Sequence, residues 1–275
     1  MLSIIISSYN AQYFEALEKN ISKTCGIPYE IIKIHNPGIY GICEAYNIGA
    51  DKSSFENLVF CHEDIDFFTN DWGKILLEEL ELPNCGIIGL AGAKYYPNAP
   101  IGYWQLNTQS MYNIVQVANG KSYHYKINQS QPVEVLDGVL LAVKKENFSK
   151  FRFNQNLIGF HAYEIDLSWR ASQSLTNYVT SRITVKHYSN GNPDKNWFLS
   201  LLDFSNDRPD RIQYTEINNR LEGFALYIFS LNTKKHFPSK RDQIKLLYKY
   251  FSFRYLGVVG IFSFIKHYIY RTASN

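Results

Sequence analysis

The sequence has few cysteines and no long apolar segment. Its four cysteines, Cys25, Cys43, Cys61 and Cys85, form no CxxC pair, and we expect free, mostly buried thiols in a reducing cytosol. A strand-like run begins at Leu2, so the first residues lack the pattern of a signal peptide. The longest apolar candidate, residues 255–265, is shorter than the roughly 18 residues that a membrane-spanning helix needs. These absences predict a cytoplasmic protein without a spanning helix.

Charge is also sparse. Charged residues make up 19% of the chain, and the net charge is +3 with a pI near 8.5. No long Lys or Arg stripe accompanies this mild excess, which argues against nucleic acid as a partner. The glycine-rich turns of dinucleotide-binding and P-loop proteins are absent after the first strand-like run. Hydrophobic residues reach 45% of 275 residues, enough for one large α/β domain and a C-terminal appendage.

Strand and helix patterns alternate over the first 91 residues. A largely β-branched run at residues 2–7 predicts a strand covered on both faces. A helix carrying Phe14, Leu17 and Ile21 follows it. Further strands are expected at residues 30–35, 57–62 and 85–91, with helices at residues 42–50 and 72–80. This alternation predicts a mainly parallel sheet flanked by helices, with right-handed crossovers.

The pattern becomes irregular after residue 91. Residues 92–131 are expected to form long loops and a hairpin, and residues 133–143 to form a strand interrupted at Asp137-Gly138. A helix is expected at residues 163–174 and one late strand at residues 178–188. From about residue 196 onward the pattern is helical. We therefore expect an α/β domain at residues 1–192, which the resemblance described below makes the catalytic domain, and a helical C-terminal extension at residues 193–275.

Polar residues gather where the predicted strands end. Open parallel sheets bind their ligands at the carboxyl ends of the strands. Four clusters occupy such positions, namely Ser7-Ser8-Tyr9-Asn10, His35-Asn36, residues 62–66 and Asp137-Gly138.

The sharpest cluster is His62-Glu63-Asp64-Ile65-Asp66, which follows an apolar strand directly. Divalent cations such as Mg²⁺ or Mn²⁺ prefer such an oxygen-rich setting and usually share it with substrate phosphates. The alternative is a solvated acidic turn that leads into the next helix.

Two further sets of polar residues can be explained by structural roles. His161, Glu164 and Asp166 lie around the start of a helix, where carboxylates are also favourable as end charges. His187 closes the late strand, and a histidine there is by itself more often structural than metal-binding.

Taken in order, these clusters resemble the family 2 glycosyltransferases of the GT-A fold, in particular a bacterial branch whose acidic motif begins with His. The resemblance covers about residues 1–190. Residues 4–10 resemble the family's first nucleotide-binding element, and residues 41–49 resemble the helix that carries an Asn under the nucleotide. Residues 60–64 take the place of the D-x-D motif, residues 135–139 resemble the strand near the donor phosphates, and residues 163–167 resemble the E-D-x-D-L element.

The resemblance implies a reaction and a set of roles. A hexosyl-type sugar would move from a nucleotide-diphosphate sugar to an acceptor hydroxyl with inversion, in the synthesis of cell-surface polysaccharide or lipopolysaccharide. Glu164 would be the catalytic base, and Asp64 and His187 would bind Mn²⁺ or Mg²⁺. The implied donor-binding residues are Ser7, Ser8, Tyr9, Asn36, Asn47, His62, Glu63 and Asp64. The implied acceptor or sugar residues are Asp137, Gly138, His161 and Asp166.

The sequence departs from the family pattern at two positions. His62 replaces the first Asp of D-x-D, and a register in which Asp64-Ile65-Asp66 is the motif stays open. Tyr163 stands where the base usually has an acidic neighbour. A catalytically silent nucleotide-sugar-binding protein is therefore one alternative. A metal-dependent nucleotidyltransferase or phosphohydrolase is another, although a nucleotidyltransferase of this architecture usually has a basic, glycine-rich loop after the first strand, and this chain does not.

Basic and aromatic residues alternate between residues 234 and 254. This pattern predicts either an amphipathic helix packed on the catalytic domain or one that rests on an anionic membrane. The expected partners are a nucleotide-sugar donor and a saccharide or lipid-linked saccharide acceptor. In the second case they include the inner face of the cytoplasmic membrane.

Overall fold

The computed structural model describes residues 1–191, 193–208 and 216–272, and the chain divides into two compact units. The first unit comprises Met1–Tyr95 and Ser110–Asn192, and the second comprises Tyr96–Gln109 and Pro193–Asn275. The segment Tyr96–Gln109 belongs to the second unit together with the C-terminal residues, although it falls within the domain predicted at residues 1–192. The predicted boundary residue, 192, lies outside the described residues.

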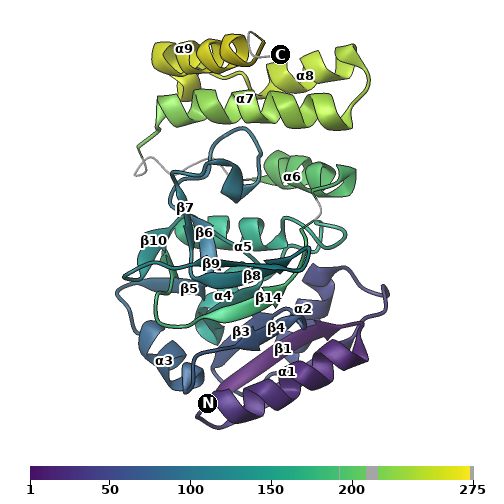
Figure 1. Cartoon of the computed structure of the whole chain (residues 1–275), viewed down its shortest axis with the longest axis vertical. Coiled ribbons are helices and arrows are strands. Elements are labelled where there is room, and N and C mark those ends of the chain that lie inside the picture. Colours follow the sequence, from purple (N-terminus) through teal and green to yellow (C-terminus); the bar gives the residue numbers. More distant parts are fainter. Residues whose placement is uncertain (192, 209–215, 273–275) are drawn as a thin grey trace. The chain divides into compact units, whose positions relative to one another are not determined.

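A seven-stranded sheet forms the centre of the first unit (Figure 1), in the order β10-β13-β5-β12-β3-β1-β2. Strand β1 runs parallel to both β2 and β3, and β5 runs parallel to β13. Strand β12 is antiparallel to β3 and β5, and β10 is antiparallel to β13. Strands β1, β2, β3, β5 and β13 therefore run in one direction and only β10 and β12 run in the other, which confirms the predicted mainly parallel sheet. The bounds are β1 Leu2–Ser8, β2 Tyr29–His35, β3 Asn57–Cys61, β5 Cys85–Gly89, β10 Gln131–Val133, β12 Leu140–Lys144 and β13 Thr176–Val179.

Helices cover this sheet because its strands are apolar on both faces. Ile4 and Ile6 of β1 belong to a core cluster with Leu17 of α1. The intervening Ile5 faces α2, where a side chain at Gly49 would overlap it, so glycine allows this close approach. The helices of the first unit are α1 Ala11–Thr24, α2 Ile42–Asp51, α3 Trp72–Glu79, α4 Lys145–Phe151 and α5 Tyr163–Ser172.

Two smaller sheets complete the first unit. One has the order β4-β14-β8-β9 and the other β11-β6-β7. The bounds are β4 Ile65–Phe67, β6 Ala91–Ala93, β7 Ser110–Tyr112, β8 Ile114–Ala118, β9 Lys121–Tyr125, β11 Val135–Leu136 and β14 Val185–Tyr188. The irregular region 92–131 therefore contains more strand than expected.

The single late strand expected at residues 178–188 is wrong. Strand β13 ends at Val179 in the central sheet, and β14 begins at Val185 in the four-stranded sheet. Between them the Thr180 amide donates to the Gly89 carbonyl, and the Thr180 hydroxyl accepts from the Arg182 amide. Buried Ile183 continues the apolar pattern through this turn, which is why the sequence reads as one strand.

The second unit is helical, as predicted for the described part of the C-terminal region. It contains α6 Lys195–Asp207, α7 Asn219–His236, α8 Lys240–Tyr250, α9 Phe253–Thr272 and the short helix η1 Tyr103–Gln105. Helix α9 is interrupted at Gly257, where φ is +52°. Among the described helices, none has the combination of length and apolar character that crossing a bilayer requires.

Candidate functional site

A cavity of about 590 Å³ opens in the first unit where β1, β2 and β3 end. Ser7 and Tyr9 line it from the end of β1, residues 36–38 from the end of β2, and residues 62–64 from the end of β3. Helix α2 contributes Ile42 and Tyr46 to the lining. The cavity thus joins three of the four polar clusters that the sequence predicts at strand ends.

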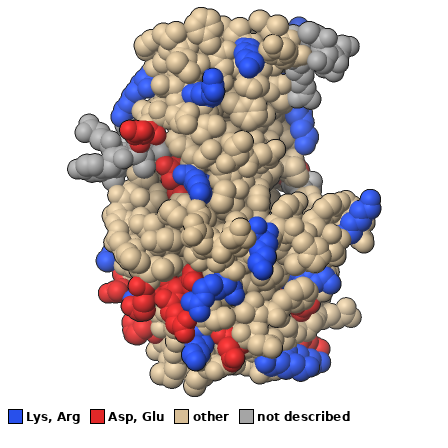
Figure 2. Space-filling model, turned by 60° about the vertical axis from the view of Figure 1, so that its left-hand side comes forward, with Lys and Arg blue, Asp and Glu red and all other residues tan. Residues whose placement is uncertain are grey.

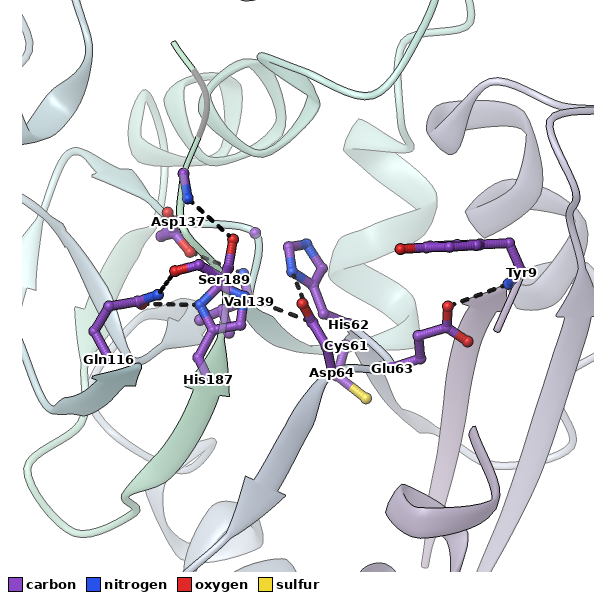
Figure 3. A network of polar contacts seen from close by, with 12 residues as sticks. Tyr9, Cys61, His62, Glu63, Asp64, Gln116, Asp137, Val139, His187 and Ser189 are labelled. Atoms are coloured by element: carbon purple, nitrogen blue, oxygen red, sulfur yellow. Dashed lines mark hydrogen bonds and ion pairs between the residues drawn. The ribbon is translucent and has the colours of Figure 1, made fainter. Parts of the chain in front are cut away.

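His62 and Asp64 of the cavity lining converge with His187 of β14 (Figure 3). The chain leaves β3 at Cys61, passes through residues 62–64 and enters β4, which pairs with β14 so that Ile65 lies opposite His187. This pairing brings the Asp64 Oδ1 atom within 3.5 Å of His187 Nε2 and 3.8 Å of His62 Nδ1. One ligand atom from each residue lies within 4.8 Å of the others, a spacing that fits a divalent cation.

The electrostatics of the three residues suit metal binding. Burial would raise the pKa of Asp64, but the neighbouring imidazoles of His187 and His62 hold that pKa below its ordinary value. Burial, together with the nearby His187, lowers the pKa of His62 against the opposing charge of Asp64. An ionised carboxylate beside a neutral imidazole is the protonation state that ligation requires.

Gln116 of β8 orients His187. Its Nε2 atom donates to the Ser189 carbonyl, so its Oε1 atom faces His187 Nδ1 at 3.0 Å and accepts from it. In a neutral ring this contact would place the proton on Nδ1 and leave the Nε2 lone pair available to a metal ion. The Nε2 atom is buried and lies 3.5 Å from Asp64 Oδ1, without a hydrogen bond of ordinary geometry to a described residue.

Tyr163 orients His62 in the same way. The tyrosine hydroxyl donates to the Gly138 carbonyl at 3.3 Å and lies 3.0 Å from His62 Nε2. Because a hydroxyl has one proton, it accepts from Nε2 in this arrangement, which leaves the Nδ1 lone pair facing Asp64. A Cβ atom at residue 138 would overlap the tyrosine ring, so Gly138 makes room for this contact.

Glu63 and Asn36 shape the lining through hydrogen bonds. The Oε1 atom of Glu63 accepts from the backbone amides of Tyr9 and Asn10 at 3.2 and 3.0 Å. The Asn36 amide nitrogen donates to Ser7 Oγ and to the Tyr40 carbonyl. Tyr9 itself is 71% exposed, so its ring is available at the mouth of the cavity.

Glu164 occupies the first turn of α5, next to Tyr163. Burial raises the pKa of its carboxyl to about 8, and the Asp137 carboxylate adds to the rise. Its Oε2 atom is buried without a hydrogen-bond partner in the described part of the chain. Asp137 supplies the acidic neighbour that Tyr163 does not. Its own Oδ1 atom accepts from the Val139 amide at 3.0 Å.

Eight predicted site residues lie outside the cavity lining, namely Ser8, Asn47, Asp137, Gly138, His161, Glu164, Asp166 and His187. Two of them, Asn47 and Asp166, have structural roles. Both amide atoms of buried Asn47 bond to the Phe153 backbone, so Asn47 anchors that segment instead of reaching a ligand. Asp166 is buried against Arg170 in an ion pair of 2.5 Å. Ser8 is buried in β1, and His161 is half-buried in the loop before α5.

The D-x-D alternatives differ in geometry. Asp64 faces His62 and His187, whereas the Asp66 carboxylate accepts from the Tyr188 hydroxyl at 2.8 Å. The sequence does not indicate Gln116, which lies in the irregular region 92–131. It does not indicate Phe160, which lines the cavity. Tyr163 is evident in the sequence only as the neighbour of Glu164, and its contact with His62 appears only in the structure.

Comparisons with known proteins identify the family and the fold. The sequence model of a glycosyltransferase-like family matches residues 3–206. A search of curated proteins found no significant match. The crystal structure of GalNAc-T7 with UDP, GalNAc and Mn²⁺ aligns with a TM-score of 0.51 at 11% identity, over 86% of this chain and 54% of that one. This chain therefore spans about half the length of that neighbour.

The structure of S. aureus TarS 1-349 in complex with UDP is also similar. It aligns with a TM-score of 0.50 at 13% identity, over 88% of this chain and 73% of that one. Both neighbours are GT-A glycosyltransferases, and this chain has the GT-A fold.

Proposed function

This chain belongs to the glycosyltransferase-like family, and we propose that it transfers a sugar from a nucleotide-diphosphate sugar to an acceptor hydroxyl. The observation that carries the proposal is the convergence of His62, Asp64 and His187 at a cavity formed by strand ends. Open α/β sheets bind nucleotides at such strand ends. The UDP in the structures of GalNAc-T7 and TarS supports a nucleoside-diphosphate leaving group.

The donor nucleotide occupies the 590 Å³ cavity. Its base stacks on the exposed Tyr9 ring, since aromatic faces bind planar bases and the ring stands at the cavity mouth. Ser7 and Asn36 contribute polar contacts on the β1 and β2 side. The diphosphate points toward Asp64, where the three ligand atoms gather.

His62, Asp64 and His187 would hold one divalent cation, and of the two predicted cations Mn²⁺ fits this donor set better than Mg²⁺. Magnesium prefers an all-oxygen environment, while two imidazoles and one carboxylate suit a transition metal. When bound, the cation supplies positive charge that stabilises the departing nucleoside diphosphate. The metal set therefore adds His62 to the two predicted ligands Asp64 and His187.

Glu164 is the general base of the reaction. Its carboxylate accepts the proton of the acceptor hydroxyl while that oxygen bonds to the anomeric carbon. The bond from this carbon to the donor phosphate oxygen breaks on the opposite side, so the configuration inverts. A pKa of about 8 makes Glu164 more basic than an ordinary carboxylate, and its partnerless Oε2 atom can accept from a hydroxyl.

The acceptor approaches Glu164 past Asp137 and His161. We assign the acceptor to cell-surface polysaccharide or lipopolysaccharide synthesis, as a saccharide or lipid-linked saccharide. This assignment rests on the family resemblance.

A donor screen tests the proposal. Purified protein is incubated with Mn²⁺, a panel of nucleotide sugars and either a panel of candidate acceptors or none, and release of nucleoside diphosphate is recorded with and without EDTA. We expect release from one donor that EDTA and Asp64→Ala abolish. Asp66→Ala is the matched control, because Asp66 contacts Tyr188 and not the two histidines.

Each outcome has a distinct meaning. If Asp66→Ala abolishes release while Asp64→Ala does not, residues 64–66 are the D-x-D motif. Donor binding without release under all conditions would favour the silent binding protein. Failure to bind any nucleotide sugar would overturn the proposal.

A further inference from the structure

The outer face of α9 is apolar and exposed. Four of its residues, Val258, Val259, Phe262 and Ile269, are 56–68% exposed, and Ile265 is 43% exposed. They recur at the three- and four-residue spacing that places side chains on one side of a helix. A stripe of this size is unusual for a surface in contact with water only.

Packing against α7 determines which side of α9 faces outward. A side chain at Gly223 of α7 would overlap the backbone of Gly260 in α9. Ser263 Oγ donates to the Arg220 carbonyl at 3.0 Å, and Leu256 is buried. These contacts hold the 256–260–263 side of α9 against α7, so the apolar stripe faces away from it.

Helix α8 extends the same surface. It contacts α7 as α9 does, and both helices lie on the same side of α7 (Figure 1). Ile244 and Tyr248 of α8 are 67% and 83% exposed. We use the name α8–α9 surface for the exposed residues Ile244, Tyr248, Val258, Val259, Phe262, Ile265 and Ile269.

Basic residues surround this apolar area. Between residues 240 and 270 the sequence has six basic residues and one acidic residue, Asp242. Arg241, Lys245 and Lys249 recur every four residues beside Ile244 and Tyr248 and are exposed. Figure 2 shows Lys and Arg side chains scattered over an otherwise largely uncharged region formed by these helices.

We propose that the α8–α9 surface docks on an anionic phospholipid membrane, with its apolar side chains in the interface and its Lys and Arg residues against the headgroups. Amphipathic helices with Lys or Arg beside Phe, Ile and Tyr lie in this way in the plane of a bilayer. A second copy of the chain is a poorer occupant, because its matching surface has the same positive charge.

Vesicle flotation tests the proposal with the full chain and without donor or acceptor. Vesicles of phosphatidylcholine alone are compared with vesicles that contain about 30% phosphatidylglycerol. We expect binding to the anionic vesicles, and we expect Phe262→Ser/Ile269→Ser to weaken it at least about tenfold. Lys240→Glu/Lys245→Glu should weaken it by about fivefold or more for each charge removed.

Matched controls change similar residues elsewhere. Ile158→Ser removes an exposed apolar side chain of the first unit, and Lys121→Glu/Lys126→Glu reverses two exposed charges there. Both should float like the unaltered chain.

Retained binding in Phe262→Ser/Ile269→Ser with unchanged helical circular dichroism would overturn the proposal. If the unaltered chain forms a dimer in solution and Phe262→Ser/Ile269→Ser is a monomer, the proposal is also overturned, and the surface is assigned to a second copy of the chain. Because no sugar transfer is measured, these results are independent of the proposed activity.

Discussion

At the scale of single residues, Glu164 combines a high pKa with a partnerless oxygen. We expect Glu164→Gln to lower kcat by about 10²–10⁴-fold, because a positioned general base contributes that much. In the unaltered protein the carboxyl is protonated below its pKa of about 8, so kcat/KM should rise with pH up to that value. Steady-state rates between pH 6 and 9 measure both effects. Donor binding by the variant should remain, and near-normal turnover would remove Glu164 from the role of base.

The same carboxyl should reduce stability at neutral pH. Its pKa is 4.5 ordinarily and about 8 in the folded chain, so the folded state binds the proton more tightly between these values. Stability is then lost as pH rises through this window, by up to about 1.4 kcal/mol per pH unit. Relative to the unaltered chain, Glu164→Gln should gain about 3 kcal/mol in the free energy of unfolding between pH 5 and pH 7.5. Urea unfolding in EDTA at both pH values measures this difference, and an equal difference at the two values would contradict it.

Gln116 should matter for metal affinity although it is no ligand. Gln116→Leu removes the acceptor that keeps the His187 proton on Nδ1, and loss of such a partner costs about 10–100-fold in metal affinity. Calorimetric titration with Mn²⁺ at fixed pH measures the change. Tyr188→Phe is the control, since it removes a hydroxyl beside His187 that contacts Asp66. Equal affinity in Gln116→Leu and Tyr188→Phe would mean that Gln116 does not set the tautomer.

At the scale of elements, the α7–α9 contact depends on glycine. Gly223→Ala would force the α7 Cβ into the Gly260 carbonyl, and overpacking of this kind costs about 1–3 kcal/mol. Thermal denaturation followed by circular dichroism should show a lower Tm for the helical unit. Arg220→Ala on the same helix keeps the backbone carbonyl that Ser263 contacts and should change Tm little. An unchanged Tm in Gly223→Ala would mean that α7 and α9 can move apart without loss of stability.

The pairing of β4 with β14 is the element contact on which the site depends. It places His187 opposite Ile65 and so beside Asp64. A shift of one residue along β14 would turn His187 to the other face of the sheet. Buried Val185 of β14, which lies opposite Phe67, keeps the register, because the same shift would turn Val185 away from the core.

At the scale of the whole molecule, the two compact units should respond separately to ligand. All three metal-site residues belong to the first unit. Mn²⁺ at about 100 times its Kd should add about 2.7 kcal/mol to the free energy of unfolding of the first unit. For a domain of this size, this increase raises Tm by about 5–10 °C. Calorimetry should show this rise in one transition only, and Asp64→Ala should abolish it. A rise of equal size in Asp64→Ala would place the metal elsewhere.

The alternating sheet and the position of its polar clusters follow from local patterns in the amino-acid sequence. Apolar runs such as residues 2–7 and 57–61 are buried strands, and polar residues follow them because strand ends reach the surface. Periodicity and order along the chain contain this information. They also indicated the acidic cluster that contains Asp64, whereas only the family resemblance indicated Glu164 as the base.

The arrangement of these residues in space follows only from the tertiary structure. No local pattern shows that β14 leaves the central sheet, that His62 joins Asp64 and His187, or that Gln116 holds a histidine. The same holds for Asn47 and Asp166, whose polar groups are used by Phe153 and Arg170. Which side of α9 is exposed depends on Gly223 and Gly260, which lie on different helices. The physical reason is common to all of these: each depends on contacts between segments far apart in sequence, and local propensity does not encode such contacts.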